Sequence, residues 1–147
     1  MNEQKHICEN PKECKRKREK WEECQEKFLP IGQQELEVFV EKLQKGEAYV
    51  RYDEHFVKRS RERCFSDSDV SEVLSYGWAI ERNKNIKGIS LVVLGYIGKN
   101  YRPVHVVFDV LDENMWVAVT AYDPRTHSWK WNDNFDGRVC FCNFENE

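Results

Sequence analysis

The change from helical to strand-like patterning near Gly77 constrains the fold more than any other feature of the sequence. Beyond Gly77, four segments rich in Val, Ile, Leu and aromatic residues alternate with polar turns; they span residues 78–82, 89–97, 104–111 and 115–122. Such residues in runs of this length favour strands, and short connections favour antiparallel pairing. We therefore predict an antiparallel meander in the second half of the chain, with residues 138–144 as a last strand.

Two helices are predicted immediately before this sheet. Asp53 is a plausible N-cap for a charged helix that runs to about Arg63. Ser66 and Asp69 then form a capping-box pattern, and the second helix stops at Gly77. The predicted fold class is therefore α+β, with two helices packed on a small antiparallel sheet.

A helical hairpin is predicted before this domain. Asn10 and the proline after it mark the start of a helix, and the Leu-Pro-Ile-Gly segment at residues 29–32 is expected to break it before a second helix begins. We therefore predict an N-terminal hairpin extension at residues 1–46 and an α+β domain at residues 47–147.

The charge of the chain is small overall but unevenly distributed. The formal net charge of -3 argues against a protein broadly wrapped in nucleic acid, because phosphate binding is normally driven by a basic surface. Positive charge is concentrated at residues 15–18 and 58–63, whereas residues 105–147 are acidic. This asymmetry can steer an anion, or dock one half of the molecule on the other.

The N-terminal residues favour a cytoplasmic location. Residues 1–6 contain no apolar segment typical of a secretory signal, and no apolar run approaches the roughly 20 residues that span a bilayer. We expect no membrane partner.

The six cysteines are many for a reducing compartment. They are Cys8, Cys14, Cys24, Cys64, Cys140 and Cys142. All except Cys64, which fits core packing best, could converge on a zinc ion if the N-terminal helix lies beside the last strand, with His6 as a spare ligand. A disulfide joining the ends and simple packing are the alternatives, because Cys14 and Cys24 share an apolar helical stripe with Trp21 and Phe28. The spacings match no standard zinc knuckle, so no cofactor is predicted and zinc stays an alternative.

A ridge of polar residues on the first of the two predicted helices is a candidate site. His55, Arg59 and Arg63 fall at i, i+4 and i+8 and therefore share one line of the helix surface. Arginine binds phosphate or carboxylate through its planar fork, and histidine adds a proton near neutral pH. The ridge could bind an anion, or it could be structural if its arginines pair with Glu62 or Asp67.

Several ordered motifs resemble a family of small bacterial and phage domains of unknown function. They are His-x3-Arg-x3-Arg-x2-Ser-x2-Asp-Val at residues 55–70, Pro-Val-His-Val-Val at 103–107, Val-Thr-Ala-Tyr-Asp-Pro at 119–124, and a trailing Trp131 (or Trp129) and Arg138. The resemblance covers residues 50–140. It implies a compact α+β domain similar in fold to the RelE and BrnT ribonuclease toxins.

The resemblance favours an enzyme, and if the domain cuts RNA, we expect metal-independent transesterification. In this chemistry a base takes the 2′-hydroxyl proton, cations stabilise the charged phosphorane and an acid protonates the leaving oxygen. The predicted catalytic residues are His55, Arg59, Arg63 and His105, and the predicted ligand-binding residues are Tyr122, Trp131 and Arg138. The function predicted in this way is a toxin-like, nucleic-acid-active domain with RNA or a nucleotide-like anion as its ligand.

Other roles stay open for the same residues. His105 lies in an apolar strand and equally fits a buried, hydrogen-bonded histidine, and Trp129 and Trp131 equally fit core packing. The alternative function is a non-catalytic binding module that uses the cationic ridge or the N-terminal hairpin. Its partner would be an antitoxin, a host protein or a nucleotide-like ligand.

Overall fold

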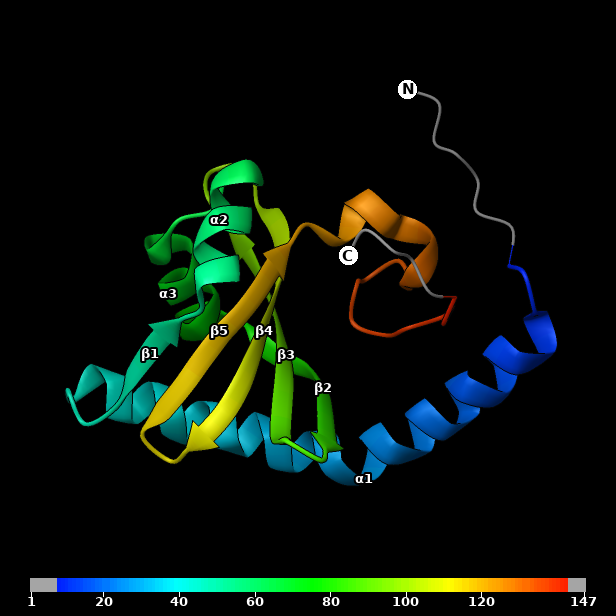
Figure 1. Ribbon diagram of the computed structural model, residues 1–147, viewed down its shortest axis with the longest axis horizontal. Coiled ribbons are helices and arrows are strands. Elements are labelled where there is room, and N and C mark those ends of the chain that lie inside the picture. The colour runs from blue at the N-terminus through cyan, green and yellow to red at the C-terminus, as the bar shows by residue number, and fades with distance from the viewer. Residues whose placement is uncertain (1–7, 143–147) are drawn as a thin grey trace.

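The structure, a computed structural model, describes residues 8–142 and has the predicted α+β fold (Figure 1). Its elements are α1 (Pro11–Gln44), β1 (Tyr49–Tyr52), α2 (Glu54–Glu62), α3 (Asp67–Tyr76), β2 (Trp78–Asn85), β3 (Gly88–Ile97), β4 (Arg102–Asp112), β5 (Met115–Tyr122) and the 3-10 helix η1 (Pro124–Lys130). Asp53 caps α2 and the Ser66 capping box starts α3, as predicted. No helix within residues 8–142 combines the length and apolarity needed to cross a membrane.

The five strands form one sheet in the order β1-β5-β4-β3-β2. Strands β2 to β5 are the predicted antiparallel meander. The expectation of a purely antiparallel sheet is wrong at β1, which pairs in parallel with β5 from Tyr49↔Met115 to Tyr52↔Ala118. Parallel neighbours need a long crossover connection. Here the connection from β1 to β5 contains α2, α3 and strands β2 to β4. The sheet is mixed, with one parallel pair and three antiparallel pairs.

All three α-helices cover one face of the sheet. The alternation of β3 turns Leu91 and Val93 toward these helices, and both side chains are fully buried. Phe39 of α1 stacks on Trp116 of β5 with ring centroids 4.1 Å apart. Figure 1 shows α1 running along the width of the sheet and continuing past β2. The second half of α1 therefore contributes to the same core as the sheet.

The predicted hairpin is wrong, because residues 11–44 form a single helix of 34 residues. Pro30 lies inside α1, where it removes a backbone hydrogen bond and bends the helix without ending it. Figure 1 shows α1 changing direction part-way along its length. Gly32 serves close packing instead of a turn, because a Cβ atom there would lie 2.7 Å from Cδ2 of Leu91. The boundary between residues 46 and 47 stays a prediction.

The edge strand β2 is capped by glutamines of α1. Gln25 donates from Nε2 to the Arg82 carbonyl at 3.1 Å, and its Oε1 accepts the Arg82 backbone N–H at 2.8 Å. Oε1 of Gln33 accepts the backbone N–H of Ala79 at 2.7 Å. These bonds occupy backbone groups that an open sheet edge would offer to another chain.

The opposite face of the sheet is covered by residues 124–142, which we call the C-terminal cover. Trp131 of this cover is buried on a second apolar cluster with Ile80, Val92 and Leu94. The predicted last strand is wrong over residues 138–142, where the structure has only a single bridge between Trp131 and Arg138. A further strand could not pair with β2 at Ala79 and Arg82, because the backbone groups of these residues already bond to Gln25 and Gln33 of α1. The remaining residues of that prediction, 143 and 144, lie outside the described part of the chain.

Candidate functional site

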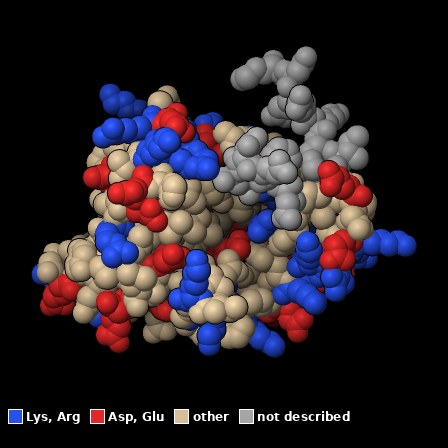
Figure 2. All heavy atoms as spheres, in the orientation of Figure 1, with Lys and Arg blue, Asp and Glu red and all other residues tan. Residues whose placement is uncertain are grey.

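A cavity of about 850 Å³ lies between the C-terminal end of α2, the C-terminal cover and the face of the sheet opposite the three helices. The space-filling view shows the surface hollowed between these parts (Figure 2). Its lining includes seven cationic or aromatic side chains, namely Arg63, Arg102, Tyr122, His127, Lys130, Trp131 and Arg138, together with the carboxyl groups of Glu62, Glu81 and Asp123. Four of these seven were predicted as site residues from the sequence, namely Arg63, Tyr122, Trp131 and Arg138.

One member of the predicted ridge reaches this pocket. Arg63, the C-cap of α2, lines it, whereas His55 and Arg59 are exposed on α2 and do not. Among the ion pairs within residues 8–142, none joins Arg59 or Arg63 to an acidic side chain. The structural alternative for the ridge, pairing with Glu62 or Asp67, is therefore not what holds these two arginines.

Arg63 is fixed by the end of β5. Its Nη1 donates to the carbonyl of Ala121 at 2.8 Å and, more weakly, to Oγ1 of Thr120 at 3.4 Å. Burial lowers the pKa of Arg63 and the nearby Arg59 adds to this, but a guanidinium stays charged at any physiological pH. Two bonds from one nitrogen use only part of the five-donor fork. The remaining donors are available to a ligand in the pocket.

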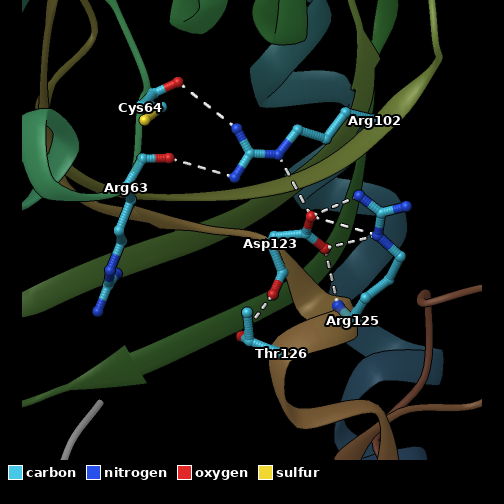
Figure 3. A network of polar contacts seen from close by, with 6 residues as sticks. All are labelled: Arg63, Cys64, Arg102, Asp123, Arg125 and Thr126. Carbon is cyan, nitrogen blue, oxygen red and sulfur yellow. Dashed lines mark hydrogen bonds and ion pairs between the residues drawn. The ribbon is translucent and has the colours of Figure 1, made fainter. Parts of the chain in front are cut away.

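An Asp123-centred network forms the rim next to Arg63 (Figure 3). The carboxylate accepts from Arg102 Nε at 3.3 Å and from Arg125 Nη2 at 2.7 Å. Burial alone would raise the pKa of Asp123, but the hydrogen bonds from Arg125 and Arg102 outweigh it and hold that pKa below its usual value. Arg102 also donates to the backbone carbonyls of Arg63 and Cys64. The network therefore ties the end of α2 to the ends of β4 and β5.

His105 is a buried residue of β4 and does not line the pocket. It has no solvent exposure, its Nε2 donates to the Phe135 carbonyl at 2.7 Å, and its Nδ1 lies 3.3 Å from the Tyr122 hydroxyl. Trp131 contacts the imidazole edge-on with ring centroids 4.4 Å apart. Burial lowers the pKa of His105 to about 4, so the ring is neutral near pH 7. This geometry matches the buried, hydrogen-bonded alternative, and the structure does not bring His105 into the pocket with Arg63.

Tyr122, Trp131 and Arg138 form an aromatic and cationic wall of the pocket. The rings of Tyr122 and Trp131 are stacked with centroids 6.5 Å apart, and burial raises the pKa of Tyr122 above its usual value. The guanidinium of Arg138 lies over the rings of Phe141, at 4.4 Å, and Trp131, at 5.9 Å. Its Nε is buried without a hydrogen-bond partner among residues 8–142. A buried donor beside a cavity marks a place for an acceptor beyond residues 8–142, such as a ligand.

Two further pocket residues, His127 and Lys130, were missed from the sequence. Both lie in η1, whose first turn is capped by Asp123. Burial lowers the pKa of His127, and it lowers that of Lys130 to about 8, with Arg138 adding to the second effect. The sequence feature that could have indicated a site here is Lys130, a single lysine between Trp129 and Trp131. Flanking aromatic residues indicate burial, and a buried lysine seldom lies outside a site or an ion pair.

Four of the cysteines converge where the N-terminus of α1 meets the C-terminal cover. The sulfur atoms of Cys8, Cys14, Cys140 and Cys142 all lie within 4.8 Å of one another. Cys24 of the predicted set is not among them, and His6, the proposed spare ligand, lies outside the described residues. Cys64, which was expected in the core, is exposed. The apolar stripe of α1 that contains Cys14 packs against the C-terminal cover. In this contact the rings of Trp21 and Phe141 meet edge-on, with centroids 6.4 Å apart.

A family model covers the central part of this architecture. Residues 52–123, which contain α2, α3 and strands β2 to β5, match the family described as Domain of unknown function (DUF4258). The match leaves out α1 and the C-terminal cover. Neither a search of curated proteins nor a search of solved structures found a match to the chain. The central 72 residues are thus similar to a domain family of unknown function, as the sequence motifs suggested.

Proposed function

We propose that this protein is a toxin-like, nucleic-acid-active domain that binds single-stranded RNA in the pocket and cleaves it without a metal ion. The observation that carries the proposal is the convergence of Arg63 and Arg138 on one cavity of about 850 Å³. These guanidiniums come from segments 75 residues apart in the sequence. Arginine binds phosphate through two parallel hydrogen bonds, and the volume suits a nucleotide-sized ligand.

Aromatic side chains complete the recognition of a nucleotide. Tyr122 and Trp131 lie beside Arg138 on the wall of the pocket. An unpaired base stacks on such rings whatever its identity, with a contribution of about 1–3 kcal/mol per base. Single-stranded RNA presents unpaired bases and phosphates together, whereas a duplex hides its bases in the helix. The combination therefore favours a single strand.

The surface near the pocket supports this choice despite the net negative charge. Lys58, Arg59 and Arg61 are exposed on α2, and Figure 2 shows basic side chains gathered over this helix. Such a patch attracts a polyanion and raises its rate of association. In this proposal His55 and Arg59 guide the RNA toward Arg63 without touching the reacting phosphate.

His127 is the side chain best placed to transfer a proton. It is partly exposed in the wall of the pocket, whereas His105 is buried and His55 lies outside the lining. Cleavage by attack of the 2′-hydroxyl needs a base near that group and positive charge around the phosphorane. We assign the first role to His127 and the second to Arg63 and Arg138, and the leaving 5′-oxygen takes its proton from water. His105 would act as a positioning residue, because it holds the Tyr122 hydroxyl.

One observation favours the non-catalytic alternative. Of the histidines in the described residues, only His127 lines the pocket, whereas acid-base cleavage uses two proton-transfer groups. A pocket lined by one imidazole and three arginines, one of which is bound to Asp123, can also simply hold a phosphorylated ligand. A protein partner, such as an antitoxin or a host target, stays a prediction.

Replacing Arg63 by alanine is expected to weaken binding of a short fluorescein-labelled single-stranded RNA by about 10- to 100-fold. Loss of a charged hydrogen bond to phosphate costs about 1.5–3 kcal/mol, which corresponds to this range. The measurement is a fluorescence anisotropy titration at fixed salt. Arg61→Ala is the matched control, because Arg61 is exposed on the same helix and outside the lining. It should change the Kd less than about 5-fold. Equal effects of the two variants would mean that RNA binds to the surface of α2 and not in the pocket.

Replacing His127 by alanine is expected to slow cleavage of RNA in EDTA by about 100-fold or more, because positioned proton transfer contributes that much. Cuts are read on a sequencing gel after incubation of total RNA with each protein, and circular dichroism checks the fold. His55→Ala should slow cutting much less than His127→Ala does, because His55 lies outside the pocket lining. Intact RNA in every lane, with binding retained, would establish the binding module instead. Absence of both binding and cutting in the wild type would refute the proposal.

A further inference from the structure

The four thiols at the junction of α1 and the C-terminal cover have the spacing of a tetrahedral metal site. The Sγ atoms are 3.8 Å apart for Cys8 and Cys142, 3.9 Å for Cys14 and Cys140, and 3.7 Å for Cys14 and Cys142. Four thiolates at about 2.3 Å from one zinc ion lie about 3.8 Å from each other along the tetrahedron edges. A disulfide would bring two sulfurs to about 2.05 Å. The observed spacing therefore fits ligands around one ion.

Backbone N–H groups point at three of the four sulfur atoms. Three sulfurs receive backbone hydrogen bonds: Cys8 from Asn10, Cys14 from Phe141 and Cys140 from Cys142. In two of these cases the donor is two residues after the cysteine, so each turn directs an N–H at its own sulfur. Backbone N–H groups gathered in this way favour negative charge, and hydrogen bonds to ligands orient and tune a metal site.

We propose that Cys8, Cys14, Cys140 and Cys142 bind one zinc ion in a closed structural site. Four sulfur ligands fill a tetrahedral shell and leave no position for a substrate, which is typical of structural zinc. Tetrahedral sulfur ligation suits zinc or iron. Sulfurs that all lie within 4.8 Å of one another leave room for a single ion and too little for a cluster of two irons with bridging sulfides. The proposal is independent of the RNA-binding role.

The ion would fasten the C-terminal cover to the body of the protein. Cys140 and Cys142 flank Phe141, whose ring meets Trp21 of α1 and the guanidinium of Arg138. The metal would thus hold the segment that presents Arg138 to the pocket. Elsewhere the cover contacts the sheet through Trp131 and Phe135 in the second apolar cluster and through the Phe135 carbonyl, which accepts a hydrogen bond from His105. Metal binding and completion of the pocket are therefore coupled.

The test is the metal content of the full chain purified from cells grown with added zinc. We expect one zinc per chain by mass spectrometry of the elements, near zero in Cys14→Ser, and one per chain in Cys24→Ser, a half-buried thiol of the same helix outside the cluster. If Cys14→Ser does not fold, Cys142→Ser, which replaces a less buried ligand, gives the same comparison. Cobalt added after removal of the zinc should give the visible bands of a tetrahedral tetrathiolate complex.

Three results would overturn the proposal. One is a wild-type protein without metal whose non-reduced mass shows disulfides among these four cysteines. Another is iron in place of zinc. The third is equal zinc content in the cluster variants and in Cys24→Ser, which would place the metal elsewhere.

Discussion

Replacing Phe39 by alanine is expected to lower the free energy of unfolding by about 3–5 kcal/mol, the usual cost of truncating a buried phenylalanine. Phe39 is 1% exposed, and its ring lies almost parallel to that of Trp116, with an interplanar angle of 5°. Alanine would leave a cavity between α1 and the sheet that a bulky neighbour such as Trp116 cannot fill. Chemical denaturation followed by tryptophan fluorescence measures the loss.

Phe28→Ala is the control for this experiment, because Phe28 belongs to the same helix and is 42% exposed. We expect it to change stability by less than about 1 kcal/mol. The comparison also tests the predicted boundary between residues 46 and 47. If Phe39→Ala were as mild as Phe28→Ala, α1 would be a separable extension. A large loss in one cooperative transition would show that α1 and the sheet unfold together.

Acidification from pH 7 to pH 4 is expected to cost the protein about 3 kcal/mol of stability through His105 alone. The pKa of this buried imidazole is about 4 in the folded protein, against about 6.5 in an unfolded chain. Between these values the unfolded chain binds a proton that the folded protein does not. Stability therefore falls as the pH drops through this window, and the contribution of His105 is exhausted below pH 4. Urea denaturation at a series of pH values measures it.

His105→Gln should flatten this pH dependence, because glutamine can still donate to the Phe135 carbonyl but does not titrate. His55→Gln, which replaces an exposed histidine, should retain the wild-type dependence. Asp123 acts in a lower window. Its pKa is below the usual carboxyl value, so its contribution is lost only as the pH falls below about 3.8. An unchanged pH dependence in His105→Gln would mean that another group titrates between pH 4 and 6.5.

The fold was predictable where local pattern and long-range packing agree. The apolar runs of β3 and β4 and the capping box at Ser66 indicated their elements correctly, because a strand that is buried on both faces needs apolar residues throughout and a helix start needs a cap. The predicted end of the helix at Pro30 and Gly32 was wrong, because it was based on the low helix propensity of these two residues alone. Packing of the second half of α1 on the sheet outweighs the cost of one lost hydrogen bond and makes Gly32 a contact residue.

The site was predictable only in part, because the C-terminal cover folds back across the sheet. Helical spacing pointed to Arg63, which lines the pocket, and equally to His55 and Arg59, which do not, because spacing does not tell which end of a ridge meets a pocket. His127 and Lys130 enter the pocket through a 3-10 helix that has no periodic pattern of its own. The cysteines could be suspected as a group from their number. Which four of them converge depends on contacts between the two ends of the described chain.

The meeting of Cys8 with Cys142 also has a consequence for the order of folding. These residues are 134 positions apart, the greatest separation that the described chain allows. Closing so long a loop carries a high entropic cost, while the meander is built from neighbours in sequence. We therefore expect the sheet to form first and the junction between α1 and the C-terminal cover to close last. A metal ion or disulfide that joins the two ends would lower the entropy of the unfolded chain more than a link between near neighbours. The contact that forms last in folding would therefore add the most to the free energy of unfolding.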